Sequence, residues 1–267
     1  MTTQSDTLDS LNKRGYANAR VVNWYDDLDF IHPTEAVILE RLLPAIKNKA
    51  LLDIGIGGGR TTKFLLDVST DYTGIDYTPA CIDAAKKKYP DANLVCRDAQ
   101  DLSIFTNESF RLILFSLNGI DYVRHEGRLR ILREAFRVLQ PGGFFMFSTH
   151  NRDYRHFNKL PWQEGAKLNL NFFKNCLYTL AFLPKHFRMR KHEVHTDEYA
   201  IVNDNAHGFS LMSYYIGIAE QRAQLEAAGF VAIEAYDMEG RNVESDRNSP
   251  WTYYLAQKPI HSTCKSL

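Results

Sequence analysis

The sequence has few cysteines, no long apolar run and no excess of charge of either sign. Its four cysteines, at positions 81, 96, 176 and 264, show no paired spacing, so we expect reduced thiols and a cytoplasmic location. No apolar stretch reaches about 18 residues and the N-terminus is polar, which predicts no membrane span, no membrane partner and no signal peptide. With 32 basic and 32 acidic residues the formal net charge is zero, so nothing in the overall charge indicates a polyanionic partner.

The most informative stretch is a glycine-rich turn between residues 51 and 60. An apolar run ends in Asp53, and glycines then alternate with other residues before a helical pattern begins. Glycine allows positive φ and close approach of a ligand, and free N–H groups at a helix start favour polar or anionic groups. A second apolar strand ends at Asp76, where a carboxylate accepts the hydrogen bonds of a ribose diol. The sequence therefore predicts a nucleotide-type site at the ends of these strands.

The spacing of the glycines separates two classes of enzyme. A dinucleotide fingerprint places a small third residue where this sequence has Arg60 or Thr62, which disfavours a nicotinamide-dependent oxidoreductase. The run Asp53-x-Gly55-x-Gly57-x-Gly59 instead resembles motif I of the class I S-adenosylmethionine-dependent methyltransferases. Asp76 and the stretches 97–102 and 136–143 continue the resemblance to about residue 151.

This resemblance implies S-adenosylmethionine as cofactor, with S-adenosylhomocysteine as product, and it implies the residues that contact them. Asp76 would hold the ribose, and Asp98 with the backbone of Ala99 would hold the adenine. The full set of implied cofactor contacts is Tyr16, Tyr25, Asp53, Gly55, Gly57, Gly59, Arg60, Asp76, Tyr77, Asp98, Ala99, Gln100, Phe115, Ser116 and Asn118.

Alternating apolar strands and amphipathic helices predict a Rossmann-like α/β fold. As in the family, we expect a seven-stranded, mostly parallel sheet completed by a C-terminal antiparallel hairpin. Residues 1 to about 12 are polar, and we expect them to be mobile. Strands are expected over 50–54, 71–76, 93–96, 110–116, 143–149, 230–236 and 251–257. One helix is expected to begin at residue 33, and further helices are expected over 60–68, 79–88, 125–139 and 218–228.

Residues 151–216 do not fit the alternation and are interpreted as a β-rich lid insertion, with strands expected over 187–194, 198–202 and 209–216. The aromatic and basic stretch 152–190 is compatible with a lid, with a homodimer interface, or with stacking on nucleic acid, and the neutral net charge favours the lid. The expected division is a cofactor-covering segment (1–45), a cofactor-binding core (46–150), the lid (151–216) and a C-terminal completion of the sheet (217–267).

Methyl transfer requires donor and acceptor to be aligned, and in many cases the acceptor must lose a proton. His150 ends the fifth strand and is the first candidate for the base, with His207 and Asn118 as further candidates. Purely structural roles remain open for each of these residues. Expected acceptor contacts are Tyr122, Asn151, Tyr214 and Tyr215. His192 and His195 would point to opposite faces of a strand, so no metal is expected.

The most consistent function is methyl transfer from S-adenosylmethionine to an oxygen or nitrogen of a small-molecule acceptor. The stretch Phe115–Tyr122 lacks the Asn-Pro-Pro-Tyr or Asp-Pro-Pro-Tyr motif of enzymes that methylate adenine bases, which disfavours a nucleic-acid substrate. Alternatives that remain open are an RNA or protein methyltransferase, a nicotinamide-dependent oxidoreductase and a non-catalytic cofactor-binding protein.

Overall fold

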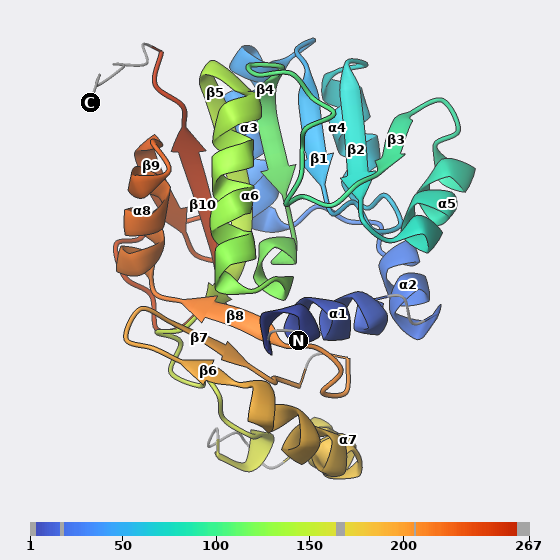
Figure 1. Cartoon of the computed structure of the whole chain (residues 1–267), viewed down its shortest axis with the longest axis vertical. Coiled ribbons are helices and arrows are strands. Elements are labelled where there is room, and N and C mark those ends of the chain that lie inside the picture. The colour runs from blue at the N-terminus through green and yellow to red at the C-terminus, as the bar shows by residue number, and fades with distance from the viewer. Residues whose placement is uncertain (1–3, 17–18, 164–168, 206, 261–267) are drawn as a thin grey trace.

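The computed structural model describes residues 4–16, 19–163, 169–205 and 207–260, which form a mixed sheet with helices on both faces (Figure 1). The helices are α1 (Gln4–Tyr16), α2 (Ala19–Asp26), α3 (Pro33–Ile46), α4 (Thr62–Val68), α5 (Pro79–Lys88), α6 (His125–Val138), α7 (Leu170–Met189) and α8 (Ile218–Ala227), with 3-10 turns η1 (Gly119–Tyr122), η2 (Pro161–Gln163) and η3 (Arg190–His192). The strands are β1 (Leu51–Ile54), β2 (Tyr72–Asp76), β3 (Asn93–Cys96), β4 (Phe110–Phe115), β5 (Leu139–Asn151), β6 (Val194–His195), β7 (Tyr199–Val202), β8 (Ser213–Ile216), β9 (Val231–Tyr236) and β10 (Trp251–Gln257).

The expected seven-stranded core is present in the order β3-β2-β1-β4-β5-β10-β9. The first five strands of this order run parallel, and β10 and β9 form the expected antiparallel hairpin at the end. The chain order reverses on either side of β1, so the carboxyl ends of β1 and β4 form the topological switch point, where such folds bind ligands. The predicted Rossmann-like fold is confirmed.

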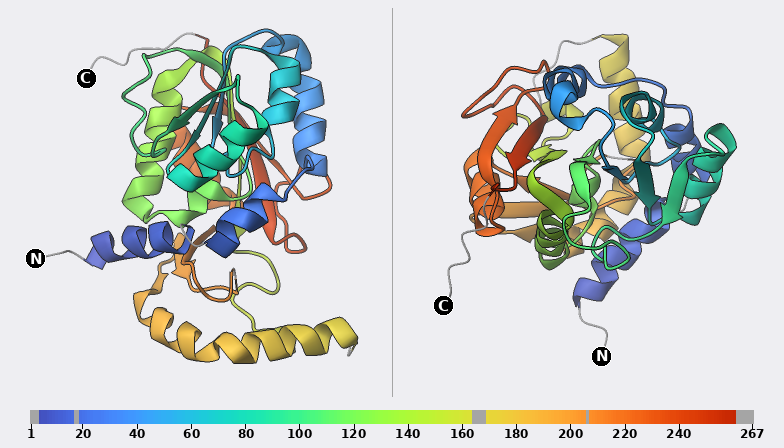
Figure 2. Two further views of the ribbon diagram at one scale, coloured as in Figure 1. Left: turned by 90° about the vertical axis from the view of Figure 1, so that its right-hand side faces the viewer. Right: turned by 90° about the horizontal axis from the view of Figure 1, so that it is seen from above.

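Side chains of the parallel strands alternate between two helical layers, as period-2 geometry requires. On one face Leu51 and Leu112 pack against α3, α4 and α5; on the other Leu52 and Ile113 pack against α6 and α8. Figure 2 shows α3 and α4 in blue on one side of the sheet and α6 in green on the other. The central strands are therefore buried on both faces, and only their ends are available for a site.

The insertion continues the core sheet and also contains a long helix that the sequence interpretation missed. β8 pairs in parallel with the last residues of β5, His150↔Tyr215 and Asn151↔Ile216, and β7 and β6 follow antiparallel. The strand predicted over 187–194 is wrong, because α7 extends to Met189 and β6 begins only at Val194. The strand expected over 198–202 is present as β7, and that expected over 209–216 is shorter.

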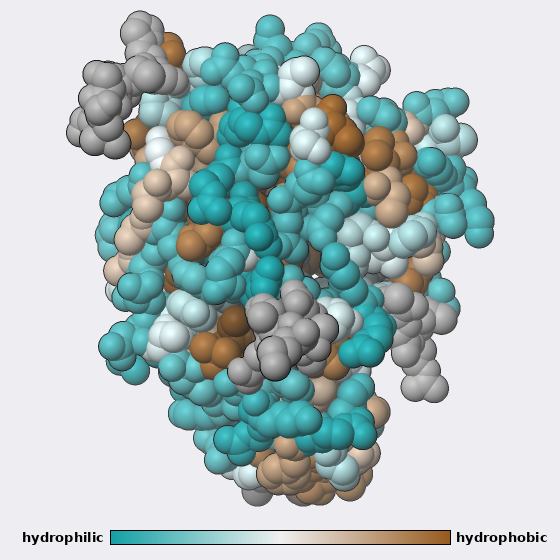
Figure 3. Space-filling model, viewed as in Figure 1, coloured by the Kyte–Doolittle hydropathy of each residue, from teal (hydrophilic) through white to brown (hydrophobic). Residues whose placement is uncertain are grey.

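Capping and tertiary burial explain why the segment before residue 190 is helical. The Asn169 side chain accepts the Phe172 N–H at 2.9 Å, which caps the first turn. Thr179, His186 and Met189 recur at helical spacing and are buried, so one face of α7 is fixed against the rest of the insertion. The opposite face lies at the lower end of the molecule, where apolar side chains reach the surface (Figure 3).

The N-terminal residues form the helix α1, which lies across the carboxyl edge of the sheet. Figure 1 shows α1 and α2 below the ends of the parallel strands. Asn12 fixes α1, since its side chain donates to the carbonyls of Tyr122 and Met212, both at 2.9 Å, and accepts the Met212 N–H at 2.8 Å. One buried amide thus connects α1, η1 and the insertion.

β1 carries a buried carboxyl group, Asp53, below the glycine turn. Its Oδ2 accepts hydrogen bonds from the hydroxyls of Thr61 at 2.6 Å and Tyr72 at 3.0 Å, and Oδ1 has no partner among the described residues. Burial raises the pKa of Asp53 to about 7, against the opposing effect of the two hydroxyls. Through the bond to Thr61, the Asp53 carboxyl group connects β1 to the end of the glycine turn.

We predict that Asn12→Ala releases α1. The three buried backbone groups that Asn12 satisfies lose their partner, which should lower the free energy of unfolding by about 1–3 kcal/mol. Hydrogen exchange should accelerate across α1 while α6 keeps its protection. Asn23→Ala, at an exposed position of α2, is the matched control and should leave both measurements unchanged. Equal protection of α1 in parent and Asn12→Ala would contradict the assigned anchor.

We predict that Asp53 makes stability depend on pH. Its pKa is raised in the folded state, so the folded protein binds the proton more tightly, and this contribution is lost as pH rises from about 4 to about 7. Relative to Asp53→Asn, the parent should lose about 2–4 kcal/mol of unfolding free energy between pH 4 and 8. Urea unfolding across this range measures the difference. The exposed Asp67→Asn should follow the parent, and a parallel curve for Asp53→Asn would show that Asp53 is ionised throughout.

Candidate active site

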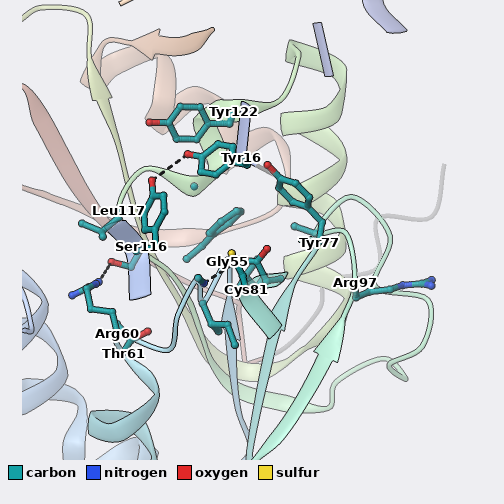
Figure 4. A pocket seen from close by; sticks show the side chains of 18 residues that line it. Tyr16, Gly55, Arg60, Thr61, Tyr77, Cys81, Arg97, Ser116, Leu117 and Tyr122 are labelled. Carbon is teal, nitrogen blue, oxygen red and sulfur yellow. Dashed lines mark hydrogen bonds between the residues drawn. The ribbon is translucent and has the colours of Figure 1, made fainter. Parts of the chain in front are cut away.

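The main pocket lies at the switch point, between the carboxyl ends of the parallel strands and the N-terminal helices. It holds about 730 Å³ of empty space, including its open mouth. Ile54, Asp76 and Phe115, the last residues of three neighbouring strands, contribute to its wall. Figure 4 shows Tyr16, Tyr77 and Tyr122 on one side of the cavity and Arg60 with Ser116 on another. A mostly apolar cleft with few polar groups is the usual form of a small-molecule site.

The glycine turn borders the pocket on one side and packs against α2 on the other. Gly55 and Gly57 line the pocket with φ of +69° and +55°, a conformation that favours glycine. A Cβ at Gly57 would lie 3.2 Å from Tyr25, and one at Gly58 would lie 2.5 Å from the Asp26 Cα. The end of α2 can therefore approach this turn only because the turn has no side chains. Gly59 faces Tyr89 and does not line the pocket.

Asp76 is the buried carboxyl group of the pocket wall. Its Oδ2 accepts the Gly57 N–H at 3.0 Å and its Oδ1 accepts the Thr78 N–H at 2.8 Å. Each oxygen keeps further acceptor capacity, because a carboxylate offers about four lone-pair sites. Burial raises the pKa of Asp76, and the two backbone N–H groups oppose that rise. This arrangement couples the glycine turn to the start of α5 and presents an acceptor to the cavity.

Arg60 connects the glycine turn to α3 and to the residue after β4. Its guanidinium makes two hydrogen bonds of 2.8 Å with the two oxygens of Glu35, and a third of 2.5 Å with Ser116 Oγ. Glu35 is fully buried and also contacts Ser116 directly. A paired, bidentate geometry is what makes a buried ion pair tolerable. Glu35 was not among the residues selected from the sequence, although it stands in the first turn of the predicted helix.

The opposite end of the pocket is formed by the residues after β2 and β3. Tyr77, Ala99 and the backbone of Arg97 face the cavity; Arg97 directs its guanidinium outward to Asp101 (Figure 4). Asp98 lies in a separate shallow depression, where it pairs with Lys13 at 2.9 Å and accepts the Gln100 N–H. Gln100 itself faces the solvent side near Arg130.

Aromatic side chains close the pocket from the N-terminal side. The Tyr16 ring lies 5.8 Å from that of Tyr25 and 4.9 Å from that of Tyr122, and the hydroxyls of Tyr16 and Tyr25 are 3.3 Å apart. Burial raises the pKa of Tyr25 to about 12, so its hydroxyl stays neutral near pH 7. His207 lies over this group, 5.4 Å from the Trp24 ring, and burial lowers its pKa. His207 contacts the aromatic cover and does not line the pocket.

His150 lies behind Tyr122, one ring away from the main pocket. Its Nδ1 is 2.7 Å from Asp121 Oδ2, and its backbone N–H donates to the same oxygen at 2.7 Å. Asp121 is fully buried, and its other oxygen contacts Arg128 and the Thr149 hydroxyl, both at 2.5 Å. A carboxylate held this way accepts the Nδ1 proton, so in the singly protonated tautomer Nε2 is the nitrogen that can accept a proton.

Aromatic rings surround the imidazole of His150. The rings of Tyr215, Tyr122 and Trp251 lie 4.8, 6.1 and 6.3 Å from that of His150. The Tyr215 hydroxyl donates to Asp204 at 2.9 Å, so this ring is held in place. The arrangement combines an imidazole, its carboxylate partner and flat aromatic neighbours next to Tyr122, which lines the main pocket.

The remaining predicted residues have structural partners. Asn118 adopts φ of 57° after β4 and donates its backbone N–H to Ser148; its Oδ1 is buried without a partner among the described residues. The Asn151 amide donates to the carbonyls of Asp246 and Ser249, and Asn151 does not line the pocket. Tyr214 faces the other side of β8, 4.5 Å above the Arg128 guanidinium.

Sequence reasoning missed several pocket residues, and few of them carry a sequence signal. The missed wall residues are Ile54, Ile56, Thr61, Cys81, Arg97, Leu117 and Gly119. Ile54, Ile56 and Thr61 adjoin the glycine run and were within reach of a wider reading of that motif. Cys81 enters only because α5 packs beside β2. Among the described residues, no group of three His, Cys, Asp or Glu side chains is arranged to hold a metal, and no helix there is long and apolar enough to cross a bilayer.

Comparison with known proteins agrees with this geometry. Residues 51–143 match the family model described as a methyltransferase domain. A ubiquinone biosynthesis O-methyltransferase of Coxiella burnetii is 28% identical over 132 residues, which are 49% of this chain and 55% of that protein. The chain therefore spans about half the length of the curated relatives it matches.

Solved structures extend the similarity to the fold of nearly the whole chain. An S-adenosylmethionine-dependent methyltransferase of Mesorhizobium loti has a TM-score of 0.59 at 17% identity, over 84% of this chain and 98% of that one. The 1,6-didemethyltoxoflavin-N1-methyltransferase of Burkholderia thailandensis, solved with 1,6-didemethyltoxoflavin and S-adenosylhomocysteine, has a TM-score of 0.51 at 15% identity, over 85% and 77%. With the sheet order and the pocket at the switch point, residues 51–143 are similar to a methyltransferase domain, and the chain has the fold of these S-adenosylmethionine-dependent methyltransferases.

Proposed function

We propose that the protein transfers a methyl group from S-adenosylmethionine to an oxygen or nitrogen of a small-molecule acceptor. The observation that carries the proposal is the position of Asp76. Its buried carboxyl group lies in the wall of a pocket at the carboxyl ends of β1, β2 and β4, bonded to the glycine turn on one side and to the start of α5 on the other. The relatives named as methyltransferases support the same proposal.

The residues present fit S-adenosylmethionine. Asp76 has free acceptor capacity for a ribose diol, and Gly55 and Gly57 line the pocket where a Cβ would press on Phe115 and Tyr25. Tyr77 and Ala99 supply an apolar surface for a flat base, and Tyr16 and Tyr25 would cover the remainder. When bound, this cofactor supplies a methyl group already activated on a sulfonium, so this chain contributes mainly alignment, exclusion of water and proton removal.

Asp98 and Gln100 are retained as adenine contacts only through the backbone turn they belong to. The Asp98 side chain is bonded to Lys13 and to the Gln100 N–H, outside the main pocket. Asp53, Gly59 and Asn118 support the glycine turn and the loop after β4 from outside the cavity. We therefore assign them positioning roles in this proposal.

We predict that Asp76→Asn weakens binding of S-adenosylhomocysteine by about 1–3 kcal/mol, because the ribose hydroxyls lose the charged acceptor of their hydrogen bonds. The parent should bind in the micromolar range, about −7 to −8 kcal/mol. Titration calorimetry measures both, with NAD as the competing ligand class. Asp83→Asn, an exposed carboxyl change on α5, is the control and should bind as the parent does. Unchanged affinity in a folded Asp76→Asn protein would remove the ribose assignment, and tight NAD binding would favour an oxidoreductase.

The His150–Asp121 pair supports a hydroxyl group as acceptor. A hydroxyl must lose its proton as the methyl group is transferred, and the Asp121 bond at Nδ1 leaves His150 Nε2 as the nitrogen that would accept it. Asp121 is paired with Arg128, and its carboxylate would stabilise the imidazolium formed. His207 is the reserve candidate, because it lies against Tyr16 and Tyr25 on the other side of the cover.

We predict that His150→Gln lowers turnover by about 10²–10⁴ and removes the acidic limb of the pH–rate profile, because the base must be neutral to act. Affinity for S-adenosylhomocysteine should stay at the parental value, since His150 does not line the main pocket. The acceptor is found first by incubating metabolite extracts with labelled methyl donor. His207→Gln is the matched variant and should keep the parental limb. If both variants keep the rate and the limb, neither histidine takes the proton.

The cellular setting belongs to the same proposal. Cys81, Cys96 and Cys176 are unpaired thiols in the described part of the chain, which supports the cytoplasmic location expected from the sequence.

The lid role of residues 151–216 is supported by β8, which brings Tyr215 to His150.

A further inference from the structure

The outer face of α7 carries an apolar stripe that nothing in the described structure covers. Leucine, phenylalanine and proline recur at positions 170, 173, 177, 180, 184 and 187, alternately three and four residues apart, which places them along one side of the helix. The exposed fractions of Leu170, Phe173, Leu177, Leu180 and Phe187 lie between 51% and 69%. In Figure 3 this region forms a tan and brown band at the lower end of the molecule. A continuous row of exposed apolar side chains on a protein surface marks an interaction site.

The charge around the stripe is of one sign. Residues 169–192 contain Lys174, Lys185, Arg188, Arg190 and Lys191 and no aspartate or glutamate. Lys185 is bonded to Ser210 and Arg190 contacts Glu193, whereas Lys174, Arg188 and Lys191 are exposed. The nearest acid in sequence, Glu193, is itself largely buried. The face is therefore both apolar and cationic, in a protein whose formal net charge is zero.

This charge decides between occupants of the stripe. A second copy of α7 would bring the same unbalanced positive charge to the seam, with no acidic residues to pair with it. Nucleic acid would satisfy the charge and leave the leucines and phenylalanines in water. An anionic lipid surface satisfies both, because the apolar side chains enter the acyl boundary while the cations reach the headgroups.

The neighbouring residues suit the same occupant. Trp162 in η2 is 42% exposed beside α7, and tryptophan is favoured at the interface between lipid and water. The inner side of α7 rests on the loop before β8, since a Cβ at Gly208 would lie 3.1 Å from the Tyr178 hydroxyl and 3.2 Å from Phe182. His207, the adjacent residue, lies over the aromatic cover of the pocket. The stripe is thus connected through one loop to the site.

We propose that α7 docks the protein onto an anionic membrane surface, with the helix lying in the interface plane. This differs from a membrane span, for which the sequence has no segment, and it replaces the expectation of no membrane partner. The proposal does not depend on the methyl-transfer reaction, because lipid binding is measured on the protein alone.

The experiment is flotation of the full chain with vesicles of phosphatidylglycerol and phosphatidylcholine, beside vesicles of phosphatidylcholine alone. The parent should float only with the anionic vesicles, and less as salt is raised. Phe173→Gln/Leu177→Gln/Leu180→Gln should lower the partition coefficient onto the vesicles about 100-fold or more, since three apolar side chains that would enter the lipid are lost. Lys174→Glu/Arg188→Glu/Lys191→Glu should reduce it by about the same factor.

Matched controls carry the same chemical changes elsewhere on the surface. Val37→Gln/Ile104→Gln/Val231→Gln changes three exposed apolar residues, and Lys63→Glu/Lys86→Glu/Lys87→Glu changes three exposed cations. Both should float like the parent. Three results would overturn the proposal: no flotation of the parent, equal losses in the controls, or a parent that sediments as a dimer and becomes a monomer when the stripe is changed. The last result would assign the face to a second copy of the chain.

Discussion

The buried ion pair of Asp121 and Arg128 connects the elements around the carboxyl end of β5. Asp121 belongs to the turn after β4 and Arg128 to α6, and both are fully removed from solvent. Arg128 also contacts Thr149 on β5 at 3.0 Å and Gln221 on α8, and it lies under the Tyr214 ring. Isolated charges at this depth would be costly, so each partner depends on the others. The same carboxylate orients His150, which links the stability of the fold to the chemistry proposed for the site.

Two separate sets of contacts close the pocket, and they act on different sides of it. On the core side, Arg60 and Glu35 fix the glycine turn to α3 and Ser116. On the outer side, α1 and α2 cover the strand ends, anchored by the Asn12 amide and by the close packing of Asp26 on Gly58. The floor of the pocket and its cover are therefore held by different contacts.

The insertion has a dual character. β8 is part of the sheet and brings Tyr215 next to His150. α7 reaches away from the core and presents an apolar, cationic face. The loop between β7 and β8 packs on α7 through Gly208 and also carries His207. If α7 binds lipid, the cover of the pocket lies close to that surface.

The sequence by itself determined the sheet, the glycine turn and Asp76, because period-2 apolar patterns and positive-φ glycines are local properties. It did not determine α7: residues 187–194 are interpreted as a strand, whereas Asn169 caps a helix that extends to Met189 and the insertion buries His186. Nor did it mark Glu35, Asp121 or Arg128, since a charged residue in a sequence is usually solvated and only the packed chain shows that these three are not. Their roles arise from neighbours far away along the chain, and that proximity exists only in the tertiary structure.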